Sequence, residues 1–383
     1  MRGQAGRDAH AKGPGVRAKI MLLLLLTLFF LASALGRTSP IVPTTSQSGQ
    51  QAEPTSHRAA RSLMGVSSTL EVGGDAAFVV DASNKKYTLN LNTDPTAIKM
   101  TTPDGSQLKV YRPSIFNNLR RHAGVSDELY RKCLDIDTLH CLSSDSKSGQ
   151  AFWRSADETI VLKTLKHYEA INLLRVLDKY AAHTMGDISC IATVVGLYRV
   201  KLRRGGKKYF IVCKNVYPKH SYHVTSRFDL KGSTVGRLAT PSSLVKKDLD
   251  LMGMETKLAL GPARDTVLHA LQRDVNFLRC QRFMDYSLLV AVERYPASHF
   301  RRFLDRMARP LSHSAADRGR IVVLGGDGLI YHIGIIDFLQ RYSFRKVLET
   351  FIKGLFHDAR KISCVPPALY ARRLFAFIAT YTY

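Results

Sequence analysis

The sequence predicts an α+β fold in which helices pack on an antiparallel sheet. The clearest sign is a hairpin over residues 194–214, whose apolar arms flank Arg203-Arg204-Gly205-Gly206. The glycine pair is expected to supply the positive φ of a tight turn. Two strands within 150–163 come before an amphipathic helix at His167–Tyr180, which leads into this hairpin. A strand–helix–strand–strand order of this kind favours an antiparallel sheet with helices on one face.

Shorter elements are predicted ahead of this region. Ala76–Asp81 and Lys85–Asn92 have the composition of two short strands around a polar turn. In Tyr111–His122 the apolar residues recur at helical spacing, and Pro113 is well placed to begin the helix. The N-terminal half is therefore expected to be mainly strands.

The second half is more helical. Apolar residues recur at helical spacing in Asp265–Cys280, which predicts a long helix. Two apolar runs, 287–292 and 330–336, are the expected strands of a second hairpin. Segments 347–356 and 367–378 are predicted to be closing helices.

The charge of the chain is unusual. Lys and Arg total 56 against 31 acidic residues, a formal net charge of +25. Such an excess favours an anionic partner: nucleic acid, acidic lipid or a phosphorylated ligand. Nucleic acid is the weakest of these, because no RNA- or DNA-binding motif accompanies the charge. The six dispersed cysteines fit no zinc pattern and are interpreted as structural thiols in a reducing compartment.

The N-terminal part divides into a leader and a linker. Residues 20–35 are almost purely apolar, basic residues precede them, and Ala32-Ser33-Ala34 is a small-x-small cleavage site. Residues 1–36 are therefore predicted to be a signal peptide or signal anchor, which would place the rest of the chain on the non-cytosolic side. Residues 37–69 are predicted to be a disordered linker, since their polar composition cannot offset the ordering entropy. The folded domain is expected over 70–383.

Lys163 is the first residue that could carry chemistry. It ends an apolar strand, and Glu169 follows on the next helix. A lysine fixed at a strand end can reach ATP phosphates while a helix glutamate holds it by ion pairing. The polar turn at Ser148-Gly149, before Phe152, could bring backbone N–H groups to a phosphate. An ordinary turn and a solvated ion pair explain the same residues.

The run from Asp229 to Thr234 (DLKGST) is a second candidate. Asp229 and Lys231 are two residues apart, so on an extended segment they point the same way. Gly-Ser-Thr adds flexible backbone and hydroxyl groups suited to phosphate or metal. An exposed turn accounts for this composition equally well.

Asp285 and Asp337 form the strongest pair of candidates. Each lies in an otherwise apolar stretch, FMDYSLL and GIIDFL, where an ionised carboxylate is costly unless it is paired or binds metal. Phosphoryl transfer needs Mg²⁺ and an acidic residue that orients the nucleophilic hydroxyl. Either aspartate alone could instead cap a turn.

These residues, taken in order, resemble the phosphatidylinositol phosphate kinase family, most closely phosphatidylinositol 4-phosphate 5-kinase. The similarity extends from about Lys109 to Phe377, and the runs DLKGST and MDYSLL are highly specific together. The resemblance implies a two-lobed fold distantly related to protein kinases, ATP and Mg²⁺ as cofactors, Asp285 and Lys231 in catalysis, and Asp337 as the metal ligand. It implies these nucleotide-binding residues: Ser148, Gly149, Phe152, Lys163, Glu169 and Asp229.

The resemblance also indicates a substrate. Arg345, Lys346, Glu349 and Lys353 resemble the segment that selects phosphatidylinositol 4-phosphate at the membrane. The expected activity is phosphorylation of its 5-hydroxyl, with the kinase at a cytosolic membrane face. This expectation conflicts with the non-cytosolic side that the predicted leader implies. A non-catalytic phosphoinositide-binding scaffold of the same fold is the alternative. Expected partners are a phosphoinositide in an anionic membrane and a second copy of the chain as a homodimer, with no nucleic acid.

Overall fold

The structure is a computed structural model, and its described residues form two compact units. It describes residues 69–73, 76–80, 86–90, 97–101, 105–135, 139–142, 150–203, 205–218, 223–255, 257–294, 319–342 and 365–383. The first unit contains the described residues up to Tyr111, with short pieces around residues 134–138 and 198–208. The second unit contains the rest. Every described candidate site residue belongs to the second unit.

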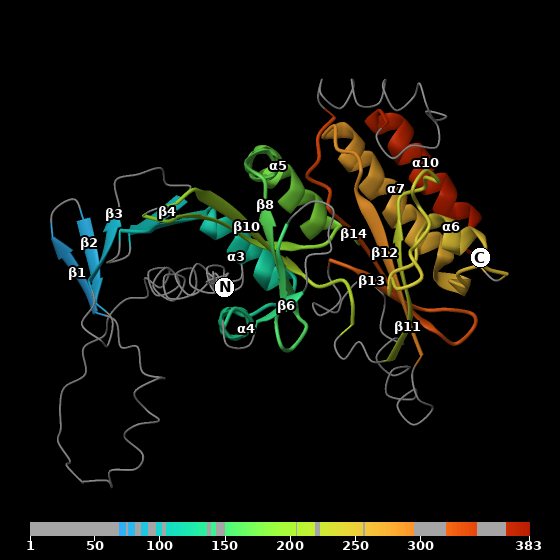
Figure 1. The fold of residues 1–383 in the computed structure, drawn as a ribbon, viewed down its shortest axis with the longest axis horizontal. Coiled ribbons are helices and arrows are strands. Elements are labelled where there is room, and N and C mark those ends of the chain that lie inside the picture. The colour runs from blue at the N-terminus through green and yellow to red at the C-terminus, as the bar shows by residue number, and fades with distance from the viewer. Residues whose placement is uncertain are drawn as a thin grey trace, which may run out of the picture. The chain divides into compact units, whose positions relative to one another are not determined.

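The first unit is an antiparallel meander (Figure 1). Its strands are β1 (Thr69–Gly73), β2 (Ala76–Val80), β3 (Lys86–Asn90), β4 (Ala97–Thr101) and β5 (Gln107–Tyr111). β5 pairs with the last part of β9 (Val194–Lys201), so that Leu108 lies opposite Val200. The two strands predicted around residues 76–92 are confirmed. β1 begins at Thr69, the last residue of the predicted linker.

The turn after β9 forms differently from the prediction. β9 and β10 (Lys207–Lys214) are neighbours in the sheet, as expected. However, neither Gly205 nor Gly206 has a positive φ. The connection spans all the residues between Lys201 and Lys207, and a loop of that length does not require the primed turn of a two-residue hairpin.

The second unit begins with helices and a short antiparallel sheet. The helices are α3 (Pro113–His122), α4 (Asp127–Cys133) and α5 (His167–Gly186). The strands β6 (His140–Leu142), β7 (Phe152–Arg154) and β8 (Ile160–Leu165) continue the order β10-β8-β7-β6. The predicted pair of strands within 150–163 and the helix at 111–122 are confirmed.

Helix α5 supports both sheets of the second unit. Its buried face includes Leu173, Leu177 and Tyr180, which recur at helical spacing. The Tyr180 hydroxyl donates to the backbone oxygen of Ala192 at 2.8 Å, and its ring stacks on Phe338 at 5.5 Å between centroids. The predicted helix at 167–180 is confirmed and continues to Gly186.

The second sheet has the order β11-β12-β14-β13 and is antiparallel throughout. Its strands are β11 (Val224–Leu230), β12 (Ser287–Glu293), β13 (Ile321–Leu324) and β14 (Ile330–Ile336). The predicted strands at 287–292 and 330–336 do pair, but β14 forms its hairpin with β13 instead of β12. β12 is buried along its whole length, which explains its continuous apolar run.

Two long helices lie against one side of this sheet (Figure 1). The helices described after β11 are α6 (Asp248–Met252), a 3₁₀ turn at Gly261–Ala263, and the two long ones, α7 (Arg264–Cys280) and α10 (Pro367–Thr380). α10 packs on α7. The helices predicted at 265–280 and 367–378 are confirmed, and with them the α+β class. The helix predicted at 347–356 lies outside the described residues.

The predicted leader over 1–36 and almost all of the linker also lie outside the described residues. Among the residues that the structure does describe, no helix has both the length and the apolar character needed to cross a bilayer.

Candidate active site

Three segments of the second sheet leave it at the same end. The first residue of β12 lies opposite the last residue of β14, and the end of β11 is opposite the second residue of β12. Because neighbouring strands are antiparallel, Lys231 after β11, Asp285 before β12 and Asp337 after β14 emerge together. Residues far apart in the sequence therefore gather at one sheet edge.

Both aspartates have left-handed backbone. The φ angle is 62° at Asp285 and 59° at Asp337, a conformation that costs a residue other than glycine about 1–2 kcal/mol but that aspartate tolerates better than most. Backbone pairing beyond the two aspartates holds them there. The N–H of Met284 donates to the backbone oxygen of Gln340 at 3.0 Å, and the N–H of Tyr342 donates to that of Arg282 at 3.0 Å.

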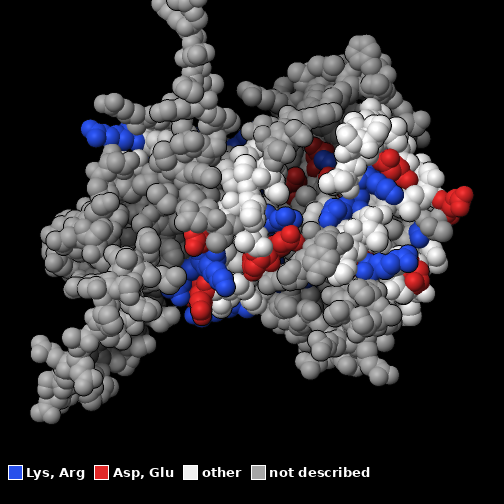
Figure 2. Space-filling view, turned by 60° about the horizontal axis from the view of Figure 1, so that its bottom comes forward, with Lys and Arg blue, Asp and Glu red and all other residues white. Residues whose placement is uncertain are grey.

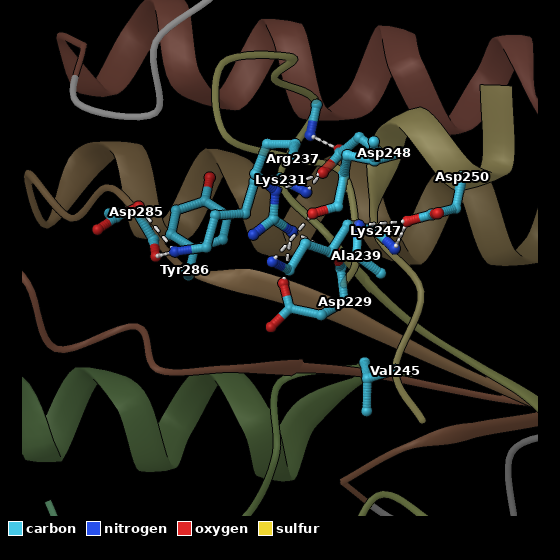
Figure 3. Close-up of polar contacts among 12 residues, drawn as sticks. Asp229, Lys231, Arg237, Ala239, Val245, Lys247, Asp248, Asp250, Asp285 and Tyr286 are labelled. Atoms are coloured by element: carbon cyan, nitrogen blue, oxygen red, sulfur yellow. Dashed lines mark hydrogen bonds and ion pairs between the residues drawn. The ribbon is translucent and has the colours of Figure 1, made fainter. Parts of the chain in front are cut away.

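Lys231 is bound to Asp285 by its side chain. Its Nζ donates to Oδ1 and to the backbone oxygen of Asp285, both at 2.7 Å (Figure 3). The Asp285 side chain remains 31% exposed. On the other side, the Tyr370 hydroxyl of α10 donates to the backbone oxygen of Tyr286. The segment that carries Asp285 is thus fixed while its carboxylate stays accessible.

Arg237 connects two further carboxylates beside Lys231 (Figure 3). Its Nη2 donates to Asp229 Oδ1 at 2.7 Å, and its Nε donates to Asp248 Oδ2 at 2.6 Å. Burial by itself lowers the pKa of Arg237, but the two carboxylates outweigh it and raise its pKa above the usual value. Arg237 therefore stays charged and holds the Asp229 side chain in place.

Lys163 pairs with Asp337. Its Nζ lies 2.6 Å from Oδ1 of Asp337 and 5.0 Å from the ring centroid of Phe152. The expected pairing with Glu169 does not form. The Glu169 carboxylate instead accepts from the backbone N–H of Lys166 at 2.8 Å, because it caps the first turn of α5.

A cavity of about 600 Å³ opens beside these groups. Its volume is typical of sites for small molecules and cofactors. Its charged lining residues are Arg154, Lys163, Glu169, Lys214, Arg227, Asp229 and Asp337, whereas Lys231 and Asp285 lie outside its lining. Most of the remaining lining is apolar and includes Phe152, Val161, Ile211, Val216, Leu244, Leu289 and Ile336.

Two titratable groups of the lining stay neutral. Burial raises the pKa of the Cys213 thiol to about 12, although the neighbouring Lys163 opposes the shift. Burial likewise raises the pKa of Tyr217 to about 12. The lining thus combines neutral and apolar side chains with charged ones.

This mixed lining fits a nucleotide. Its apolar side chains suit a purine base, and Lys163 suits the phosphates. Mg²⁺ is usually held by one or two carboxylates together with substrate phosphates and water, and Asp229 and Asp337 supply such a pair at the cavity. The described part of the chain contains no group of three or more His, Cys, Asp or Glu that could hold a metal alone.

Some predicted residues lie outside the described part of the chain. They are Ser148, Gly149, Arg345, Lys346, Glu349 and Lys353. Conversely, the sequence analysis assigned no role to Arg237 or Asp248, which complete the polar network. No signal in the sequence separates Arg237 from the other basic residues or Asp248 from the other acidic ones.

The described surface carries mixed charge. Figure 2 shows acidic and basic side chains lying among one another on one face. The basic residues expected to face a membrane in the late segment, such as Arg345 and Lys353, are not among those described. The described residues on the face shown in Figure 2 therefore do not form a continuous basic patch.

The fold and the site together are typical of a kinase-like phosphotransferase, and comparison with known proteins identifies the family. The family model for phosphatidylinositol-4-phosphate 5-kinase matches residues 134–321 and 313–381. A human protein named phosphatidylinositol 4-phosphate 5-kinase-like protein 1 is 31% identical over 349 residues, 84% of this chain and 87% of that protein.

In two further relatives the alignment covers a smaller share of the relative. Mouse phosphatidylinositol 4-phosphate 5-kinase type-1 alpha is 32% identical over 310 residues, 71% of this chain and 56% of its own. A phosphatidylinositol 4-phosphate 5-kinase of Schizosaccharomyces pombe is 28% identical over 342 residues, 71% of this chain and 45% of its own. The chain belongs to the phosphatidylinositol-4-phosphate 5-kinase family, and its α+β architecture is the kinase-like fold of that family.

Proposed function

We propose that this protein is an ATP-dependent kinase that phosphorylates the 5-hydroxyl of phosphatidylinositol 4-phosphate and forms the 4,5-bisphosphate. The observation that carries the proposal is the pair of lysine–aspartate contacts at one sheet end, Lys163 with Asp337 and Lys231 with Asp285. One pair lines the cavity and the other lies outside its lining. One pair can therefore bind ATP in the cavity, while the other acts on the lipid.

The cavity pair serves ATP. Lys163 is assigned to the nucleotide phosphates, with Phe152 beside it and the apolar side chains of the lining against the base. When bound, Mg²⁺ neutralises the charge of those phosphates, and Asp337 with Asp229 are the carboxylates assigned to hold it. Lys163 and Asp337 neutralise each other in the free protein, so nucleotide binding exchanges their mutual contact for contacts with the ligand.

The second pair serves the lipid. The oxygen of the 5-hydroxyl bonds to the γ-phosphorus as the bond from that phosphorus to the bridging oxygen breaks, and ADP leaves. Asp285 orients the hydroxyl and accepts its proton. Lys231 keeps the Asp285 carboxylate in place through its two 2.7 Å contacts.

The lipid substrate implies a membrane surface. We assign Arg345, Lys346, Glu349 and Lys353 to recognition of the phosphoinositide, at a cytosolic leaflet where ATP is available. Lys and Arg near an anionic leaflet contribute about 1 kcal/mol each, and this chain has 56 of them. A homodimer would present two such surfaces to the same membrane.

Replacement of Asp285 tests the proposal. Asp285→Asn keeps a residue type that tolerates left-handed backbone but cannot accept the proton. With ATP, Mg²⁺ and vesicles containing phosphatidylinositol 4-phosphate, wild-type protein should form the 4,5-bisphosphate, and D285N should lower the rate about 10²–10⁴-fold. The matched control is Asp265→Asn, because the Asp265 side chain is 84% exposed on α7.

Three results separate the alternatives. Turnover by wild type and D265N but not by D285N supports the kinase. Equal turnover by all three proteins contradicts the role of Asp285. Binding to phosphoinositide vesicles with no turnover and no ATP binding would identify a scaffold of the same fold.

A further inference from the structure

Asp248 is a fully buried acidic residue at the centre of the polar network. It lies at the start of α6, and its exposed fraction is 0%. One carboxylate oxygen, Oδ1, accepts from the backbone N–H groups of Lys231 at 2.9 Å and Gly232 at 2.7 Å. The other, Oδ2, accepts from Nε of Arg237 at 2.6 Å. Both oxygens are therefore occupied by donors from the loop that follows β11.

These contacts define the direction in which Lys231 leaves the sheet. The N–H of Lys231 is fixed by Asp248, and its Nζ is fixed by Asp285. A hydrogen bond to a charged acceptor is stronger than one to a neutral acceptor. A residue whose backbone and side chain are both held in this way has little freedom to rotate.

The same loop also packs closely against α10. Gly232 has a φ of +64°, and a Cβ atom added there would lie 2.8 Å from Cα of Leu374 in α10. Gly232 therefore contacts both the Asp248 carboxylate and the backbone of α10, which leaves the loop little room to shift.

We infer that Asp248 is a positioning residue that holds Lys231 against Asp285. The inference rests on the proposed function. A buried carboxylate is costly even when it is paired, and an apolar replacement of an ion pair is often no less stable. Stability alone therefore does not account for the charge at Asp248, whereas accurate placement of Lys231 does. A misplacement of about 1 Å at a reacting group can lower a rate about 100-fold.

The test compares two aspartates of the same short helix. Asp248→Asn removes one acceptor from the network. Asp250→Asn makes the same chemical change two residues later, where the carboxylate accepts only from the backbone N–H groups of Lys247 at 2.8 Å and Ala239 at 2.9 Å (Figure 3). We expect D248N to lower kcat about 100-fold and D250N to leave it close to wild type. D248N should also lose more thermal stability than D250N, because it removes the buried charged partner of Arg237.

Coupling to Lys231 distinguishes positioning from a general loss of structure. If Asp248 acts through Lys231, the double variant D248N/K231M should be no slower than K231M alone. Independent structural damage would instead multiply the two losses. Asp248→Glu is measured beside D248N because it keeps the negative charge that Arg237 needs; it should fold and still turn over more slowly than D250N.

A second measurement does not depend on turnover. The Lys231 side chain is only 17% exposed, and its ammonium group is held by two acceptors of Asp285, so it should react slowly with an acylating reagent. Mass spectrometry should show faster acylation of Lys231 in D248N and D248E and an unchanged rate in D250N. If the wild-type protein showed no turnover, the proposed function would be refuted. The acylation rates would still test whether Asp248 positions Lys231. Equal acylation of Lys231 in all variants would overturn the positioning role.

Discussion

At the scale of single residues, Lys163 and Asp337 neutralise each other's charge at the proposed nucleotide site. The Lys163 side chain is 13% exposed and that of Asp337 is 46% exposed. The Lys163 side chain is thus largely buried, whereas the Asp337 side chain remains exposed to solvent. An incoming triphosphate can displace the carboxylate from Lys163 without first dehydrating a fully solvated ammonium group.

This arrangement predicts a specific loss when Lys163 is replaced by Met. A hydrogen bond to a charged group contributes about 1.5–3 kcal/mol, so K163M should raise the Kd for ATP about 10–100-fold. Isothermal titration calorimetry checks this value. Lys179→Met is the matched control, because Lys179 is exposed on α5, outside the cavity lining. Equal Kd values for K163M and K179M would contradict the assignment of Lys163.

At the scale of elements, the turn after β11 depends on glycine at two positions with different surroundings. Gly232 has a φ of +64° and lies against α10, whereas Gly236 has a φ of +68° with nothing within 4 Å of an added Cβ. At both positions the positive φ favours glycine. Only at Gly232 would a side chain also collide with a neighbouring element.

Alanine at each position separates the two effects. Gly236→Ala should destabilise the protein by about 1–2 kcal/mol through its left-handed backbone. Gly232→Ala should add about 1–3 kcal/mol of overpacking against Leu374. Urea unfolding of both variants measures the difference. If G232A unfolded at the same urea concentration as G236A, the close approach of the loop to α10 would be wrong.

Elements with a strong periodic pattern were predictable from the sequence, and elements defined by pairing were not. α7 and the β9–β10 hairpin carry their own signals, because the apolar residues of α7 recur at helical spacing and the arms of the hairpin are apolar runs on either side of a polar turn. β11 does not: Thr225, Ser226 and Arg227 interrupt its apolar residues, and the strand exists because it pairs with β12. α6 is too short for helical periodicity to be visible.

The same distinction holds for the site. Asp285 and Asp337 stand out in the sequence because each carboxylate interrupts an apolar run. The pairing of Lys163 with Asp337, instead of with Glu169, depends on the meeting of elements separated by more than a hundred residues. Asp248 could not be given a role from sequence, because its burial and its three donors exist only in the folded chain.

At the scale of the whole molecule, a formal charge of +25 makes electrostatic attraction the expected cause of the proposed attachment to anionic membranes. Such attraction acts within a Debye length of the surface, which falls from about 10 Å at 0.1 M salt to about 3 Å at 1 M. Interactions that depend on surface charge alone should therefore weaken strongly over this range. Contacts inside a closed headgroup site are screened much less.

Salt dependence consequently separates attachment from recognition. Binding to phosphatidylserine vesicles, measured by co-sedimentation, should fall about tenfold or more between 0.1 M and 1 M salt, as the contribution of about 1 kcal/mol from each nearby Lys or Arg is screened. Vesicles with phosphatidylinositol 4-phosphate at the same surface charge should retain more binding at high salt, because a phosphate recognised by a specific site is held at short range. Neutral phosphatidylcholine vesicles give the baseline. Identical salt curves for the two anionic lipids would show attraction without recognition and would count against phosphatidylinositol 4-phosphate as the substrate.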